Sequence, residues 1–313
     1  MAARYWRLLL LGELGFAVVI ATTLRVTFNT ALTPAMLTGL GVWLLLPGVL
    51  VGASFVVAGG MSSAQRPRGA WIESLRAWVR ESAALARATF AMALEPWRRF
   101  EYVGPGGGAP QPANPVLLIH GVVCNRGIWR PLARVLRAHG FGPIAAVNLE
   151  PPLGNIGSHA EYVAQEIRQL RRDCGGARVA VIAHSMGGLV ARDILRLLGP
   201  DDISRIITLG SPHHGSWWAR ALPGLACRQM EPGSCWLTNL NAAQEGRFPV
   251  AVTCIYSLND NLIMPSTSAI LKGATSVELK GLGHLSLLSA RPAIDCTLAT
   301  LIGSRAGRKP CPT

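Results

Sequence analysis

Apolar residues are concentrated in two long stretches near the start of the chain. The stretch Leu8–Leu24 is apolar except for Glu13 and two threonines, and Leu37–Ala58 contains no charged residue. A helix needs about 20 mainly apolar residues to cross the hydrocarbon core of a bilayer. The second stretch meets this need. The first meets it less well, because a charge inside the bilayer is unfavourable, although Glu13 lies near the start of its stretch. We expect residues 1–60 to form a membrane anchor of two helices.

Arginine residues flank the two stretches unevenly. Arg4 and Arg7 precede the first stretch and Arg25 alone lies between them. Four follow the second stretch: Arg66, Arg68, Arg76 and Arg80. Because positive residues are retained on the cytoplasmic side, this pattern predicts that both ends of the hairpin face the cytoplasm. The start of the chain also fits a signal peptide, with small residues around Ala21. The rival topology, with a single span, would place the rest of the chain in the periplasm.

Residues 61–115 form a connecting region with a different pattern. Trp71–Arg99 carries apolar residues at helical spacing, and Pro96 is expected to end the helix. An arginine-rich amphipathic helix can lie on lipid headgroups, or it can pack as the first helix of the domain that follows. Gly104–Pro115 is rich in glycine and proline, which predicts a loop or linker.

From Val116 onward, short apolar runs alternate with amphipathic segments. The apolar runs predict strands at Val116–Ile119, Pro143–Leu149, Arg178–Ala183, Ile203–Leu209, Val250–Ser257 and Thr275–Leu279. The amphipathic segments predict helices at Ile128–His139, Ser158–Arg172, Leu189–Leu198 and Ala290–Ile302. Continuous apolar strands separated by helices are typical of an α/β fold, with a mostly parallel sheet and helices on both faces. We expect such a domain over residues 116–313. A lid is inserted at about 211–248, because that connection is too long for a simple loop.

A string of small residues joins the third predicted strand to the helix after it. The string Ala183–Gly188 reads AHSMGG, with Ser185 at the turn. A strand, a tight turn carrying serine and then a helix form a nucleophile elbow, in which small residues let strand and helix approach closely. The helix that follows offers backbone N–H groups and a positive dipole end to an oxyanion. Ser185 is therefore the candidate nucleophile.

A serine nucleophile needs a histidine base, and that histidine needs a carboxylate to orient it. After an elbow of this type the order along the chain is serine, acid, histidine. Asp260 follows the strand 250–257 and His284 follows the last strand, so both lie at the carboxyl edge of the predicted sheet. We predict Asp260 as the acid and His284 as the base. His213 and His214 remain alternative bases, and a turn-forming Asn-Asp pair is the alternative interpretation of Asp260.

Two N–H groups are needed to hold the oxyanion. One belongs to Met186, the residue after the serine, and the other is expected from Val122, in the loop after the first strand. His120 ends that strand, where a role in holding the backbone is expected. Cys124 is a rival nucleophile by residue type, but it lacks the strand–turn–helix setting.

Cysteine content and charge narrow the function further. The seven cysteines contain no Cys-x-x-Cys pair, which argues against a zinc site. Cys227 could pair with Cys235, and Cys296 with Cys311, in an oxidising compartment. The net charge of +13 is carried almost wholly by arginine. The arginines are dispersed and no nucleic-acid-binding motif is present, which favours a basic surface beside anionic lipids over nucleic acid as the partner.

The region from Val116 to Ile302 resembles the α/β-hydrolase superfamily, in particular bacterial triacylglycerol lipases and esterases. The resemblance is carried by His120-Gly121, Ala183–Gly188, Thr208–Gly215, Asp260 and Gly283-His284. It implies an α/β-hydrolase fold with a lid insertion, preceded here by a transmembrane helical hairpin. Some lipases of this class bind calcium near the histidine. We expect no metal and no cofactor in this chain, because no clear pair of acidic ligands is present.

Together these features predict a membrane-anchored serine hydrolase of carboxylic esters. Trp217 and Trp218 in the lid are candidate substrate-binding residues, because large apolar groups on an insertion mark a binding surface. The anchor and the apolar lid favour lipid esters, hydrolysed at the cytoplasmic face of a bacterial inner membrane. An acyltransferase or a thioesterase would use the same triad, and a non-catalytic membrane scaffold that retains the fold is the alternative from another class.

Overall fold

The computed structural model describes residues 1–61, 71–95, 114–244 and 246–306. The first three helices are α1 (Ala2–Phe28), α2 (Leu32–Met61) and α3 (Trp71–Ala93). The later helices are α4 (Arg130–Ala138), α5 (Ile156–Asp173), α6 (Met186–Leu198), α7 (Leu225–Gln229), α8 (Cys235–Gln244) and α9 (Arg291–Ala306). The strands are β1 (Val116–Ile119), β2 (Ile144–Ala146), β3 (Val179–His184), β4 (Ile203–Leu209), β5 (Ala251–Tyr256) and β6 (Thr275–Glu278). Short 3-10 helices lie at Arg126–Trp129, Trp217–Ala221, Ser266–Ala269 and Ser286–Leu288.

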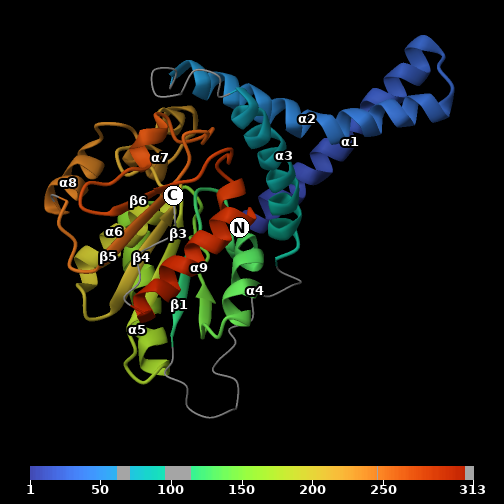
Figure 1. The fold of residues 1–313 in the computed structure, drawn as a ribbon. Helices are drawn as coiled ribbons and strands as arrows, with labels where there is room; N and C mark the ends of the chain where they lie inside the picture. The colour runs from blue at the N-terminus through green and yellow to red at the C-terminus, as the bar shows by residue number, and fades with distance from the viewer. Residues whose placement is uncertain (62–70, 96–113, 245, 307–313) are drawn as a thin grey trace.

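The six strands form one parallel sheet in the order β2-β1-β3-β4-β5-β6 (Figure 1). Neighbouring residues of a strand point to opposite faces of the sheet. In β1, Leu117 and Ile119 enter one buried cluster, whereas Val116 and Leu118 enter the other. Both faces are covered, and this is why the strands are continuous apolar runs in the sequence.

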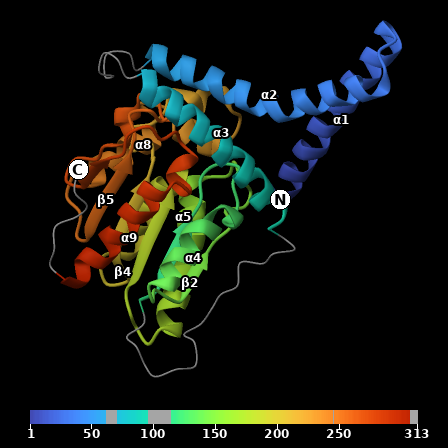
Figure 2. The same cartoon turned by 45° about the vertical axis from the view of Figure 1, so that its right-hand side comes forward.

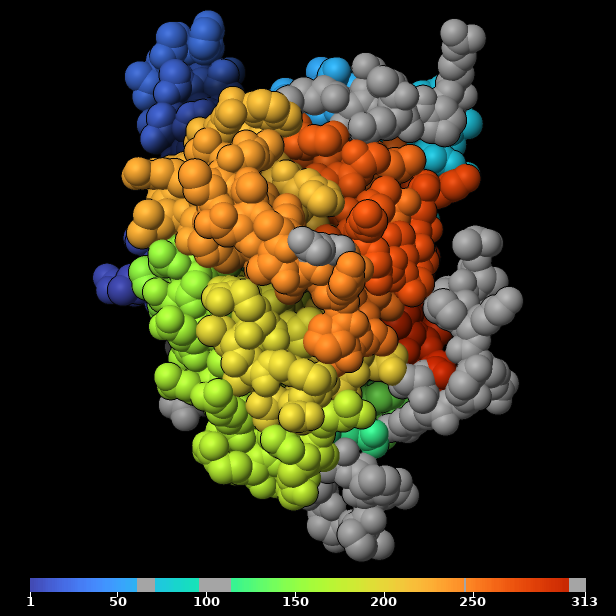
Figure 3. All heavy atoms as spheres, turned by 90° about the vertical axis from the view of Figure 1, so that its left-hand side faces the viewer, coloured from blue at the N-terminus to red at the C-terminus, as the bar shows by residue number. Residues whose placement is uncertain are grey.

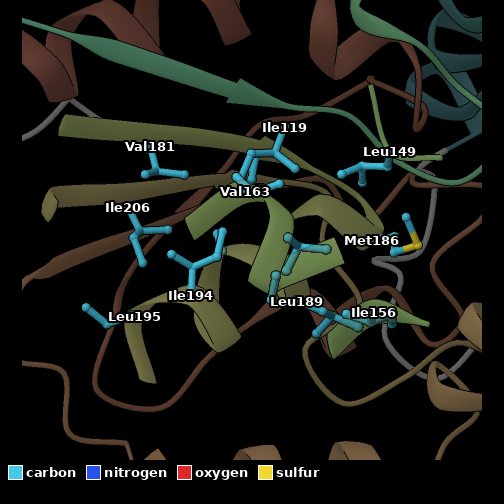
Figure 4. Close-up of a cluster of buried hydrophobic side chains, with 14 of the residues drawn as sticks. Ile119, Leu149, Ile156, Val163, Val181, Met186, Leu189, Ile194, Leu195 and Ile206 are labelled. Carbon is cyan, nitrogen blue, oxygen red and sulfur yellow. The ribbon is translucent and has the colours of Figure 1, made fainter. Parts of the chain in front are cut away.

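Helices cover the sheet on both sides. Core residues of α5 and α6 fill the cluster on one face, and those of α4 and α9 fill the cluster on the other. Figure 4 shows the first cluster, in which Ile156 of α5 and Leu189 of α6 lie near Met186, the first residue of α6. The first turn of α6 is therefore anchored in the core.

The strand order places a topological switch point between β1 and β3. The chain passes from β1 to β2 on one side and then returns to build β3 to β6 on the other. In open parallel sheets, ligands bind at the carboxyl ends of the strands beside such a switch point. The loop that follows β1 and the elbow that follows β3 meet there, so the topology alone brings Val122 close to Ser185.

The helices α1 and α2 form a hairpin whose closed end projects away from the sheet, and α3 lies between the hairpin and the rest of the protein (Figures 1 and 2). Both helices are long and apolar enough to cross a membrane, and only 6% and 11% of their most apolar windows are buried. Pro47 lies inside α2, which bends midway along its length, as expected where proline removes a helical hydrogen bond.

The lid insertion contains the 3-10 helix Trp217–Ala221 together with α7 and α8. In Figure 3 it forms the upper part of the surface, in yellow and orange. Cys227 and Cys235 lie in this insertion as free thiols, so the predicted disulfide between them is wrong. Cys227 is buried, whereas Cys235 is exposed to solvent. Cys311, Arg66, Arg68, the end of the predicted helix at 96–99 and most of the predicted linker at 104–115 lie outside the described residues.

Candidate active site

Ser185 lies between β3 and α6 in a conformation that few residues adopt. Its φ is 55° and its ψ −128°, a strained combination that persists only where the surroundings enforce it. Backbone hydrogen bonds on both sides do so: the Ser185 N–H donates to the carbonyl of Leu209, at 3.0 Å, and its carbonyl accepts from the N–H of Gly188, also at 3.0 Å. The Ser185 side chain makes no capping hydrogen bond to α6, so its hydroxyl is available for chemistry.

The glycines of the elbow are required by close contacts. A Cβ on Gly187 would lie 2.5 Å from the carbonyl oxygen of Ile119, and a Cβ on Gly188 would lie 2.1 Å from the Oγ of Ser211. A Cβ on Gly121 would lie 2.7 Å from the Cβ of Ser185 itself. The small residues therefore let the loop after β1 and the start of α6 converge on the serine.

The loop after β1 is the candidate for one half of the oxyanion hole. Val122 lines the same cavity as Ser185, and Val123 next to it has φ 58°, which is rare for a β-branched residue. The N–H of Met186 belongs to the first turn of α6, where backbone donors have no partner within the helix. Of the two residues predicted to bind the oxyanion through their N–H groups, Met186 follows Ser185 in sequence and Val122 lines the same cavity.

The structure brings Asp260 and His284 together at the carboxyl ends of β5 and β6. The Nδ1 of His284 lies 2.9 Å from Oδ2 of Asp260 and 3.1 Å from Oδ1. Asp260 Oδ1 also accepts the N–H groups of Leu262 and Ile263, each at 2.9 Å. Both partners are almost fully buried, with 2% and 4% of their surface exposed. An ionised carboxylate bonded in this way holds the imidazole in the tautomer with hydrogen on Nδ1 and leaves Nε2 able to accept a proton.

Burial alone would lower the pKa of His284, but its neighbours outweigh this effect. The Asp260 charge and hydrogen bond, with the Glu81 carboxyl, raise the pKa of His284 above its ordinary value of 6.5. A raised pKa means that the protonated imidazolium of His284 is stabilised. A base that accepts a proton during a reaction needs this stabilisation.

The other two histidines near the elbow, His120 and His184, form hydrogen bonds with backbone groups. His120 donates from Nδ1 to the Gly121 carbonyl, at 2.8 Å, while its Nε2 accepts the N–H of Leu149, at 3.1 Å. Burial lowers the pKa of His120 to about 4, so it is neutral. His184 donates from Nε2 to the carbonyl of His284, at 3.1 Å, which fixes the loop that carries the candidate base.

The alternative bases lie elsewhere. His213 is buried with its Nε2 3.1 Å from the Thr208 hydroxyl, and His214 lines a separate basic pocket with Arg192 and Lys272. The lining of the Ser185 cavity, within the described part of the chain, includes neither of them.

Ser185 and His284 open into one apolar cavity of about 320 Å³. Trp218 of the lid lines this cavity, whereas Trp217 is 39% exposed and lies under the guanidinium of Arg220. The structure therefore brings only one of the two predicted lid tryptophans to the site. Cys124 also lines the cavity, but burial raises the pKa of its thiol to about 12, so it remains protonated and is a poor nucleophile.

Comparison with known proteins shows a likeness to lipases over part of the chain. Residues 154–267 match the family described as "PGAP1-like alpha/beta domain". A triacylglycerol lipase of Pseudarthrobacter phenanthrenivorans is 27% identical over 113 residues, which cover 34% of this chain and 35% of that protein. A triacylglycerol lipase of Pseudomonas fragi is 30% identical over 111 residues, 33% of this chain and 36% of that protein. The matched segment thus spans about a third of the curated relatives.

Solved structures extend the likeness over more of the fold. Aspergillus fumigatus lipase B superposes with a TM-score of 0.56 at 20% identity, over 64% of this chain and 55% of that one. The mature form of a Bacillus licheniformis lipase gives 0.56 at 18% identity, over 63% of this chain and 95% of that one. This chain is an α/β-hydrolase by fold.

The structure also brings Glu81 of α3 to this candidate site, a residue that is not among those predicted from the sequence. Its carboxyl oxygens accept the N–H groups of Leu285, at 2.7 Å, and Ser286, at 2.8 Å, directly after His284. Only 1% of Glu81 is exposed. Burial raises the pKa of Glu81 to about 7, although the two amide donors oppose the rise. Glu81 therefore links α3 to the loop that carries His284.

Two asparagines extend this link. Asn261 accepts the His284 N–H on its Oδ1, at 3.0 Å, and donates from its side chain to Ser54 of α2, at 2.8 Å. Asn259 accepts the Gly281 N–H, at 3.1 Å, and donates to Ser74 of α3, at 3.4 Å. The acid loop and the histidine loop are thus joined to each other and to the N-terminal helices.

A signal for Glu81 exists in the sequence. Residues Ala77, Ala84 and Met92 mark the buried face of α3, and Glu81 lies among them. An acidic residue on the apolar face of an amphipathic helix requires a buried partner. The pattern shows that Glu81 needs donors, but only the fold shows that they are the amides beside His284.

Proposed function

We propose that this protein is a membrane-anchored serine hydrolase that cleaves carboxylic esters of lipids. The observation that carries the proposal is the buried Asp260–His284 pair beside Ser185 in one apolar cavity. A nucleophile, an oriented base and a backbone oxyanion site together constitute the machinery of acyl transfer. The lipases among its relatives support ester hydrolysis as the reaction.

In the first half of the reaction, the Oγ of Ser185 attacks the ester carbonyl carbon and His284 Nε2 takes the serine proton. The carbonyl π electrons move to the oxygen, and the N–H groups of Val122 and Met186 stabilise the oxyanion. The intermediate then collapses: the bond to the alcohol oxygen breaks, and the alcohol leaves with the proton from His284.

In the second half, water attacks the acyl-serine and gives its proton to His284. The carboxylic acid leaves, and Ser185 recovers its proton. Asp260 holds the imidazole in the correct tautomer throughout.

The membrane anchor is supported by how the hairpin joins the fold. The indole Nε1 of Trp6 in α1 donates to the Val123 carbonyl at 2.8 Å, so the first turns of the hairpin contact the loop after β1. A hairpin that crosses the membrane twice places its two ends on the same side. Together with the flanking arginines, this favours a cytoplasmic site.

Ester hydrolysis by the full-length protein in detergent tests the function. We expect turnover of p-nitrophenyl esters that falls on the order of 10³-fold or more in Ser185→Ala and in His284→Ala. His214→Ala is the control and should retain the wild-type rate. Turnover that persists in Ser185→Ala would refute the assignment, and no turnover in the wild type would favour the non-catalytic scaffold. A reporter fused to the C-terminus tests the topology, since a periplasmic signal would contradict a cytoplasmic site.

A further inference from the structure

The wall of the Ser185 cavity is completed by the N-terminal helices. Beside lid residues such as Trp218 and Leu222, the lining includes Trp6 of α1 and both Leu85 and Met92 of α3. These three residues lie outside the region that resembles lipases. The space beside the nucleophile is therefore enclosed between the lid and the helices that adjoin the membrane.

Trp6 is fixed at the rim of this space. Its indole Nε1 donates to the carbonyl of Val123, at 2.8 Å, in the loop that carries the candidate oxyanion donor. The next residue, Arg7, donates from Nε to the carbonyl of Ala93 at the end of α3, at 3.0 Å. These contacts hold the first turns of α1 against both the site and α3.

Leu85 and Met92 lie on the one face of α3 that turns toward the site. They follow Glu81 by 4 and 11 residues, spacings that return to the same side of a helix. Met92 is fully buried, and Leu85 is half-buried. The opposite face carries Leu75, Val79 and Phe90, each about half exposed. One face of α3 thus lines the cavity, and the opposite face exposes apolar side chains at the surface of the protein.

We propose that the acyl chain of the substrate is bound between the lid and these helices, with Trp6, Leu85 and Met92 as specificity-determining residues. The inference rests on the proposed esterase function and names the part of the substrate that the anchor recognises. A cavity of about 320 Å³ falls within the size range of small-molecule sites, and its apolar lining suits an acyl chain. The membrane helices are then part of the substrate site as well as a tether.

Chain-length profiling of Leu85 variants tests this directly. The full-length protein in detergent would be assayed with p-nitrophenyl butyrate and p-nitrophenyl decanoate. Leu85→Trp fills the cavity, so we expect the kcat/KM for decanoate to fall about tenfold or more, because each buried methylene contributes about fourfold. The value for butyrate should fall much less, so the readout is the ratio of the decanoate to the butyrate value. Leu75→Trp makes the same change on the exposed face of α3 and should leave both values unchanged.

The opposite change gives a second, independent readout. Leu85→Ala enlarges the cavity, and we expect the ratio of dodecanoate to decanoate hydrolysis to rise above the wild-type ratio. Equal losses on short and long esters in Leu85→Trp would show a merely structural role and overturn the proposal. An unchanged ratio in both Leu85 variants, with normal hydrolysis, would overturn it while leaving the esterase function intact. A wild type that hydrolyses no ester would refute the esterase function instead, and the inference with it.

Discussion

The two halves of the candidate site are held in different ways. Ser185 and the Val122 loop lie at the ends of β3 and β1, and buried core packing and close glycine contacts fix them there. Asp260 and His284 lie in loops after β5 and β6. Those loops are held by side chains of α2 and α3, chiefly Ser54, Ser74 and Glu81.

This contrast separates a half held mainly by the sheet, with an added hydrogen bond from Trp6 of α1 to the Val123 carbonyl, from a half that depends on α2 and α3. The nucleophile needs only the local geometry of strand, turn and helix. The base and its acid need contacts with residues some 200 positions away in the chain, such as those from Glu81 to Ser286. Damage to the first half should therefore reduce stability and activity together, whereas damage to the second half should reduce activity more than stability.

The largest effect is expected from Gly187→Ala, in the half formed by the sheet. The new Cβ would lie 2.5 Å from the Ile119 carbonyl oxygen, and overpacking of this kind costs about 1–3 kcal/mol. Thermal unfolding should begin several degrees lower, with ester hydrolysis lost in parallel. Gly142→Ala, where a Cβ meets nothing within 4 Å, is the control. A wild-type melting temperature in Gly187→Ala would contradict the close approach.

Glu81→Leu tests the half held by the N-terminal helices. It leaves the buried amides of Leu285 and Ser286 without acceptors, and each buried unsatisfied group costs about 1–3 kcal/mol. We expect the His284 loop to move so that water reaches these amides, which limits the loss of stability but displaces the base, so kcat should fall roughly 10- to 100-fold. Glu81→Gln, which keeps one carbonyl acceptor, should lie between the wild type and Glu81→Leu. Glu73→Gln on the same helix is the control. A rate within about twofold of the wild type in Glu81→Leu would show that Glu81 does not position the His284 loop.

Trp6→Phe should have a smaller effect on the oxyanion loop. The change keeps an aromatic ring in the cavity wall but removes the hydrogen bond to the Val123 carbonyl, a contact worth about 0.5–1.5 kcal/mol. We expect kcat to fall roughly two- to tenfold. Tyr5→Phe, at the exposed neighbouring position, should change nothing. A full rate in Trp6→Phe would show that Val123 holds its positive φ without help from α1.

The smallest expected effect is a shift in the pH dependence of ester hydrolysis. The base must be neutral in the free enzyme, so kcat/KM should rise with pH through the pKa of His284, which lies above 6.5. The groups that face His284 are Asp260, Glu81 and the neutral His184. Glu81→Gln removes a carboxyl that raises this pKa, so the acid limb of the profile should move to lower pH. A shift toward higher pH would contradict the sign of that interaction.

Sequence alone predicts most of the sheet and the order of the proposed triad. The strands are continuous apolar runs, and their loops contain few residues that could act as base or acid, so Asp260 and His284 could be selected by position. The helix α6 begins at Met186 and not at the predicted Leu189. Gly187 and Gly188 have low helical propensity, but close contacts with Ile119 and Ser211, respectively, fix them in the first turn.

Other features depend on tertiary contacts that no local pattern contains. Trp217 and Trp218 are indistinguishable in sequence, yet only Trp218 faces the cavity. Val123 at positive φ is atypical for a β-branched residue. The partners of Glu81 and the cavity position of Trp6 arise because the N-terminal helices pack onto the hydrolase fold.

Covalent labelling tests the central claim most directly. The full-length protein would be treated with an alkyl fluorophosphonate, which phosphonylates activated serines, and the modified residue would be located by peptide mass spectrometry. We expect a single adduct on the peptide that contains Ser185, formed much more slowly in His284→Ala and in Asp260→Asn. An adduct on another residue, or equal labelling of Ser185→Ala, would contradict it.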